Sequence, residues 1–120
     1  MKVTRFEDLD VWQKARELAK VVYRLTADQQ VSRDFGLRNQ MRRAAVSIMA
    51  NIAEGCARKG SRECAQFLFV AKASAAELQS HAYVALDQGY MGAPDFKELY
   101  DQLDHASRML SNVITHLRTH

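Results

Sequence analysis

The last quarter of the chain carries an apolar repeat that constrains the fold more than any other feature of the sequence. Its apolar residues recur three and four positions apart, which places them on one face of an α-helix. Such a repeat is typical of the seam along which helices pack in coiled coils and bundles. The repeat comprises Phe96, Leu99, Leu103, Ala106, Leu110, Val113 and Leu117. It predicts a long helix that begins at Pro94, since proline is tolerated in the first turn.

Three further segments show helical periodicity. The first runs from Leu9 to Thr26, and Asp8 is expected to cap it. The second runs from Asp34 to Gly55. The third begins at Ser61, whose hydroxyl is expected to cap the helix, and ends near Gly89.

The four predicted helices are joined by short connections, which make consecutive helices run in opposite directions. The sequence therefore predicts an all-α protein, an antiparallel up-down four-helix bundle that forms a single domain over residues 1–120. A chain of this length buries enough surface to fold without disulfides or metals. No segment of useful length alternates with the period of two that indicates a half-buried strand.

Composition and the N-terminus bear on where the protein resides. No apolar run approaches the ~20 residues that span a bilayer, so we expect no membrane partner. The opening sequence MKVTRFEDLD lacks the apolar core of a secretion signal, which favours a cytoplasmic protein. Cys56 and Cys64 are expected to be free thiols, because their spacing fits neither a CxxC motif nor a zinc site.

The positive charge of the chain is concentrated in one segment. Residues 33–62 carry seven Lys or Arg against two acidic residues, whereas the remainder carries ten basic and twelve acidic residues. A concentrated positive patch indicates an anionic partner, and it predicts binding of RNA or DNA through backbone phosphates, with RNA favoured. The candidate binding residues are Arg38, Arg42, Arg43, Arg58, Lys59 and Arg62.

Two other interpretations of the basic segment stay open. The first is a solvated face that forms salt bridges with Glu17, Asp101 and Asp104 of neighbouring helices. The second is an interaction adaptor, in which the basic residues dock an acidic protein. We expect no aromatic platform beside the arginines, and so contacts with phosphates or shape rather than with stacked bases.

A polar motif of Asn51, Glu54 and Gly55 lies towards the end of the second predicted helix. Asn51 falls near the apolar face, where it either fixes helix register through hydrogen bonds, the commoner role, or lines a polar ligand pocket. Glu54 lies in the last turn of this helix, where the helix dipole disfavours an anion. We therefore expect a cationic partner for it, in Arg43, Arg58 or a residue of another subunit. Gly55 is expected to end the helix.

Two sequence motifs resemble a known family. Phe6–Ala15 reads FEDLDVWQKA, and Leu37–Arg58 reads LRNQMRRAAVSIMANIAEGCAR. In this order the two motifs resemble the four-helix-bundle proteins encoded in intervening sequences of bacterial 23S rRNA, a group also labelled the S23 ribosomal protein family. The likeness includes Glu63–Leu68 and Ser74–Leu78, and therefore covers nearly the whole chain.

The resemblance implies an up-down four-helix bundle and, in relatives, a ring-like homopentamer. It also implies kinship with the accessory variability protein of diversity-generating retroelements, a basic barrel that binds nucleic acid and a reverse transcriptase. We therefore expect a homo-oligomer, with an acidic protein such as a reverse transcriptase as the alternative partner. For most family members no biochemical function is established.

The chain departs from the family pattern at two places. Met49 stands where the family usually has a proline, which keeps this helix straighter because no backbone hydrogen bond is lost. Gln30-Val31-Ser32 replaces a Phe-Pro pair, and this change is expected to alter the loop between the first two helices.

No residue pattern indicates an enzyme. The sequence contains no glycine-rich phosphate loop, no GxSxG or HExxH motif, and no Glu-x-x-His pair of the kind found in di-iron bundles. His116 and His120 are one turn apart but have no obvious third ligand, so we expect neither a metal nor a cofactor. The sequence therefore predicts a non-enzymatic scaffold that binds nucleic acid.

Overall fold

The computed structural model describes residues 5–119, and all regular secondary structure within them is helical. Four long helices form the molecule: α1 (Asp10–Thr26), α3 (Phe35–Ala57), α4 (Ser61–Asp87) and α5 (Ala93–Thr119). Two short helices flank α1, namely η1 (Phe6–Asp8) before it and α2 (Gln29–Arg33) after it. The predicted all-α four-helix bundle is confirmed.

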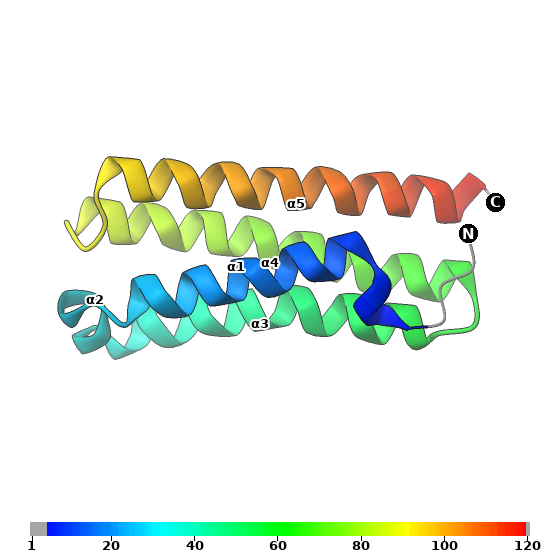
Figure 1. The fold of residues 1–120 in the computed structure, drawn as a ribbon, viewed down its shortest axis with the longest axis horizontal. Helices are drawn as coiled ribbons and strands as arrows, with labels where there is room; N and C mark the ends of the chain where they lie inside the picture. Colours follow the sequence, from blue (N-terminus) through cyan, green and yellow to red (C-terminus); the bar gives the residue numbers. More distant parts are fainter. Residues whose placement is uncertain (1–4, 120) are drawn as a thin grey trace.

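The long helices run alternately up and down, so the start of α1 and the end of α5 lie at the same end of the bundle (Figure 1). Consecutive long helices are neighbours, and α3 and α4 share the most extensive contact. The contact between α1 and α5, which completes the bundle, is the least extensive of the four contacts between neighbouring long helices. The resulting rod measures 46 × 19 × 19 Å.

The apolar repeat of α5 faces the core along most of its length. Its central members are fully buried: Leu99, Leu103, Ala106 and Leu110. Towards the C-terminus, Ile114 is buried and Val113 is only half-buried. This shift follows from helix geometry, because a straight helix of 3.6 residues per turn drifts away from a 3.5-residue repeat.

Alanines form the buried face of α4. Ala71, Ala75, Ala82 and Ala85 have no exposed surface. Side chains this small bring neighbouring backbones close together, so these alanines set the helix spacing in addition to favouring the helix itself. The opposite face of α4 carries larger exposed apolar side chains.

The start of α3 has a side-chain cap that was not predicted from the sequence. The Asp34 carboxylate accepts a hydrogen bond from the backbone N–H of Leu37 at 3.1 Å and caps α3. The two caps that were predicted, at Asp8 and Ser61, are absent. Asp8 lies in η1 and does not cap α1, and Ser61 is itself the first residue of α4, which has no side-chain cap.

Gly55 does not end its helix, contrary to the sequence-based prediction. The α3 helix continues to Ala57, and Gly55 is buried inside it. A Cβ atom at Gly55 would lie 3.1 Å from both the Cys64 carbonyl oxygen and the Phe67 Cβ atom. The residue is therefore a point of close approach between α3 and α4 rather than a stop signal.

The segment after α1 was expected to be a loop and contains the short helix α2. Val31 anchors this helix with only 2% of its surface exposed. At the same end of the molecule, the Tyr90 hydroxyl donates to the Asp34 carboxylate at 3.3 Å. This bond ties the turn between α4 and α5 to the start of α3.

No helix within residues 5–119 has the length and apolarity needed to cross a membrane. Both cysteines are free thiols, as predicted. Trp12 is buried and packs edge-on against Phe6, with ring centroids 5.0 Å apart, so the two rings anchor η1 to α1.

Candidate nucleic-acid interface

The six predicted binding residues form two groups at opposite ends of α3. The helix cluster consists of Arg38, Arg42 and Arg43, and the loop cluster consists of Arg58, Lys59 and Arg62. A helix rises ~1.5 Å per residue, which places Arg42 and Arg58 about 24 Å apart along the axis. The structure therefore does not bring the six residues into a single patch.

Arg42 is the most ordered member of the helix cluster. It is half-buried, and its Nε donates to the Thr26 Oγ1 atom at 2.8 Å. Its guanidinium lies 4.5 Å from the centroid of the Tyr23 ring. Thr26 has no exposed surface and itself donates to the Val22 carbonyl at 2.7 Å. Arg42 is thus held across the α1–α3 contact by neutral groups.

Arg38 is held by the segment that precedes it. Its Nη1 donates to the Ser32 carbonyl at 3.3 Å and its Nε donates to the Asn39 side-chain oxygen at 3.2 Å. Its guanidinium lies 4.8 Å from the centroid of the Phe35 ring. Arg43, one residue beyond Arg42, is exposed.

These contacts overturn the expectation that the arginines lack aromatic neighbours. Phe35 is 63% exposed and Tyr23 is 45% exposed, so both rings are accessible beside a guanidinium. Phe35 precedes Arg38 by three residues in the same helix, and this spacing was a usable signal in the sequence. Tyr23 comes from α1 and meets Arg42 only through tertiary packing.

Arg58 and Lys59 of the loop cluster lie in the connection between α3 and α4, and Arg62 lies in the first turn of α4. Arg58 is the C-terminal cap residue of α3, and its guanidinium lies 4.7 Å from the Phe67 ring centroid. Lys59 and Arg62 are exposed. Because α4 starts at Ser61 without a side-chain cap, its positive dipole end lies beside these cations.

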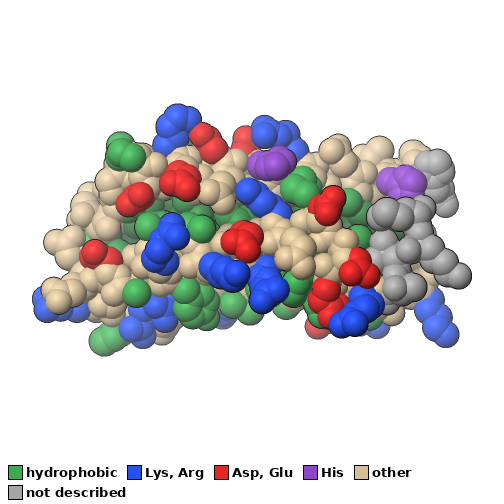
Figure 2. Space-filling view, in the orientation of Figure 1, with side chains coloured by type: hydrophobic (Ala, Val, Ile, Leu, Met, Phe, Trp, Pro, Cys, Tyr) green, Lys and Arg blue, Asp and Glu red, His purple; other side chains and the backbone are tan. Residues whose placement is uncertain are grey.

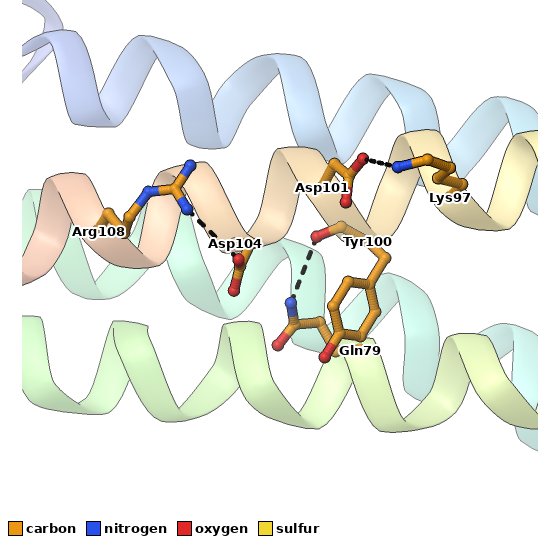
Figure 3. A network of polar contacts seen from close by, with 6 residues as sticks. All are labelled: Gln79, Lys97, Tyr100, Asp101, Asp104 and Arg108. Carbon is orange, nitrogen blue, oxygen red and sulfur yellow. Dashed lines mark hydrogen bonds and ion pairs between the residues drawn. The ribbon is translucent and has the colours of Figure 1, made fainter.

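The acidic residues that were considered as salt-bridge partners for the arginines pair with other residues in the structure. Along α5, Lys97 pairs with Asp101 at 2.7 Å and Arg108 pairs with Asp104 at 3.5 Å, and Figure 3 shows both pairs. In α1, Lys20 contacts Glu17 at 3.3 Å. Within residues 5–119 none of the six candidate residues forms an ion pair. The proposed salt bridges to Glu17, Asp101 and Asp104 are therefore wrong.

Acidic and basic side chains are interspersed on the face shown in Figure 2. The close-up in Figure 3 also shows the Gln79 side chain of α4 reaching the Tyr100 carbonyl, a bond of 3.3 Å that crosses the α4–α5 contact. The polar groups of this contact and of the α5 surface are thus largely paired with one another. The excess of basic over acidic residues lies instead in residues 33–62, which include α3 and the loop that follows it.

Asn51 has a structural role in the bundle. Its Nδ2 donates to the Ser47 carbonyl at 2.8 Å and to the Ser47 hydroxyl at 3.0 Å. The Ser47 and Ser74 hydroxyls lie 2.8 Å apart and link α3 to α4. A satisfied network of this kind fixes how two helices align. Ser74 was not recognised as part of it, although its position on the alanine face of α4 marks it as buried.

Glu54 does not pair with the cations proposed for it. Neither Arg43 nor Arg58 forms an ion pair with this carboxylate, and no other residue in the described part of the chain does so. Glu54 is exposed near the end of α3. A partner on another subunit stays a prediction.

Within residues 5–119 no group of three or more His, Cys, Asp or Glu side chains is placed to hold a metal ion. His116 lies near the end of α5, and His120 falls outside the described residues. Burial raises the pKa of the Cys56 thiol and of the Cys64 thiol. Neither thiol therefore has the character of an activated nucleophile.

Comparison with known proteins identifies the family. Residues 7–112 match the profile of the family described as "23S rRNA-intervening sequence protein". The chain belongs to this family. The matched range contains both basic clusters and the polar motif, so the resemblance noted in the sequence is confirmed.

A solved structure supports the family fold. It is described as a protein of unknown function from the S23 ribosomal protein family of Bacteroides thetaiotaomicron. The two chains are 20% identical, and the superposition has a TM-score of 0.80 over 87% of this chain and 97% of the other. At this identity the likeness establishes the bundle architecture. Among proteins with curated descriptions, none matches the chain.

Proposed function

We propose that this protein is a non-enzymatic, cytoplasmic scaffold that binds RNA through the phosphate backbone. One observation supports the proposal most strongly: the six basic side chains lack acidic partners among residues 5–119, whereas the carboxylates of α1 and α5 considered for them pair within their own helices. Uncompensated positive charge attracts phosphates, and phosphate contacts supply most sequence-independent affinity for nucleic acids.

Exposed rings in the helix cluster support a preference for unpaired RNA. Tyr23 and Phe35 each carry a guanidinium over the ring and are otherwise accessible. Stacking of one base on an aromatic ring contributes about 1–3 kcal/mol. Bases inside a duplex are not free to stack in this way, so loops and bulges fit the helix cluster better than a continuous helix.

Self-association is the second part of the proposal. An α4 apolar stripe follows the outer face of that helix and comprises Phe69, Val70, Ala73, Ala76, Tyr83 and Val84. An exposed stripe of this length favours burial against another copy of the chain. A ring, such as the homopentamer implied by the family resemblance, repeats both basic clusters and turns weak phosphate contacts into useful avidity.

The test is a titration of nuclease-treated protein with a hairpin RNA that has a large loop, over a tenfold range of salt. We expect log affinity to fall linearly with log salt, with a slope of about −0.7 for each phosphate contacted in single strands. The variant R58E/R62E should lower affinity on the order of tenfold and reduce that slope. The variant Y23A/F35A should weaken binding to the loop more than binding to a duplex of equal length.

The matched control is K97E/R108E, which makes the same change in net charge on α5. Both residues are exposed and only form ion pairs along their own helix, so the fold should tolerate this change. Equal losses in the two double variants would assign the effect to net charge and contradict the proposed site. Absence of binding at low salt would favour the adaptor alternative, with an acidic protein partner such as a reverse transcriptase.

A further inference from the structure

An apolar cavity of about 680 Å³ opens at the end of the bundle where α1 begins. It exists because α1 starts at Asp10, whereas α5 continues to Thr119 and α4 begins at Ser61 on the same side. The last turns of α3 and α5 and the first turn of α4 therefore extend beyond the start of α1. The volume lies within the range of about 300–1,000 Å³ that small-molecule pockets occupy.

The inner wall of the cavity is apolar and comes from all four long helices. Val11, Ile52, Leu68, Val113 and Leu117 contribute to it. Val11, Ile52 and Leu68 have at most 3% of their surface exposed, so the accessible apolar wall comes mainly from the half-buried Val113 and Leu117, together with Leu9, Cys56 and Cys64. Such a wall binds an alkyl chain, because apolar surface on both partners is removed from water.

The mouth of the cavity is basic. Arg58, Lys59 and Ser61 of the α3–α4 connection lie at this edge. Lys59 is exposed and forms no ion pair within residues 5–119, whereas nearby Glu7 is paired with Arg5 at 2.6 Å. The mouth therefore presents an uncompensated positive charge to whatever enters the apolar interior.

We propose that this cavity binds a single-chain amphipathic anion, an alkyl carboxylate, with its chain inside and its headgroup beside Lys59. The two requirements of such a ligand, an apolar interior and a cation at the entrance, meet here in one pocket. This cavity is distinct from the proposed RNA-binding surface, because the alkyl chain would lie between the helices at the end of the bundle and not on the outer surface of α3. It shares with the RNA site only the cations at the mouth.

The two cysteines provide a reporter that is specific to this cavity. Cys56 and Cys64 both belong to its lining and are the only cysteines of the chain. A ligand inside the cavity must slow their alkylation by a small maleimide. A ligand bound elsewhere on the surface leaves the alkylation rate unchanged.

The experiment measures maleimide alkylation of the intact protein with octanoate, decanoate and dodecanoate, each kept below its micelle concentration. We expect protection of both thiols, with apparent affinity rising about fourfold for each added methylene until the cavity is full. An alkanol of equal chain length should protect more weakly, and Lys59→Gln should remove most of that difference. Absence of protection, or equal protection by alkanol and alkanoate, would overturn the proposal.

Cavity-filling variants give the control. Asn112→Phe and Val113→Phe place a ring in the pocket and should abolish alkanoate protection, and Asn112 is exposed, so its variant spares the core. Thr115→Phe adds the same ring to an exposed site of α5 outside the lining and should leave protection intact. Loss of protection in all three variants, or in none, would contradict the site. Affinity for hairpin RNA should be the same in all three, which separates this test from that of the RNA function.

Discussion

The two ends of α3 carry the same amount of positive charge but hold it in different ways. At its start, Arg42 is fixed by the buried Thr26 and by Tyr23, and Arg38 is held by backbone and side-chain oxygens. At its end, Lys59 lies in a loop beside an open cavity, and Arg62 is exposed in the first turn of α4. Equal charge in the sequence therefore gives one ordered surface and one loosely held surface.

The difference arises from what packs against each end. The start of α3 is covered by α2 and by the turn after α4, whose Tyr90 hydroxyl contacts Asp34. On the α1 side, the end of α3 contacts η1, because α1 begins farther along the bundle. We expect the ordered end to confer selectivity for unpaired bases and the loose end to contribute mainly charge.

The largest expected effect is a change in stability, and it is measured by comparing substitutions at two glycines of α3. Gly55→Val at the open end should destabilise the protein by about 1–3 kcal/mol, because the new side chain meets α4 at 3.1 Å. Gly36→Ala at the other end meets only the Asp34 side chain at 3.9 Å and should be neutral or stabilising by a few tenths of a kcal/mol. Urea unfolding of both variants checks this. Equal effects would mean that the two helix ends are packed alike.

A smaller effect on stability is expected from substitutions at the residues that precede α3 and α4. Asp34→Ala should cost about 1 kcal/mol, because it removes the bond to the Leu37 N–H and the partner of Tyr90. Gly60→Asp should add a few tenths of a kcal/mol by supplying a side-chain cap that α4 lacks. Thermal unfolding of the two variants measures the difference. A loss of stability in Gly60→Asp would show that the start of α4 is already satisfied.

The smallest effect concerns the thiols at the open end. Burial raises the pKa of Cys56 and of Cys64, so both should react with maleimide more slowly at neutral pH than an exposed thiol does. Above the ordinary thiol pKa, the unfolded chain loses these protons before the folded chain does. Their contribution to stability should therefore be intact at neutral pH and decline as the pH rises through the folded-state values.

The measurement is the urea midpoint from pH 7 to pH 10, in the natural protein and in a Cys56→Ala/Cys64→Ala variant. The decline above pH 9 should be shallower in the variant, because it has no thiols to titrate. Identical slopes in the two proteins would show that the thiols are as exposed in the folded state as in the unfolded state.

Much of the fold could be predicted because local pattern and tertiary packing agree. The repeat from Phe96 to Leu117 indicates a buried face wherever the helix packs, and its central members are buried in the bundle. The predictions that failed rest on residues that can have either of two structural roles. A glycine near a helix end serves either as a terminator or as a contact point, and only the position of α4 assigns the second role to Gly55.

The sequence predicted which residues belong to the candidate site, but it did not predict how they are arranged in space. The sequence identified all six basic residues, and the family profile spans them. It did not predict that Tyr23 lies beneath Arg42, because the two residues are on different helices. Nor did it indicate the cavity, which results from the unequal reach of α1 and α5.

The sequence by itself determined the four long helices, their alternating directions and the concentration of charge in residues 33–62, because periodicity and composition are local properties. The tertiary structure decided which carboxylates neutralise which cations, which aromatic rings the arginines cover, and where the bundle is left open. These outcomes depend on distances between segments far apart in the chain. Such distances are set by how four helices of unequal length pack together.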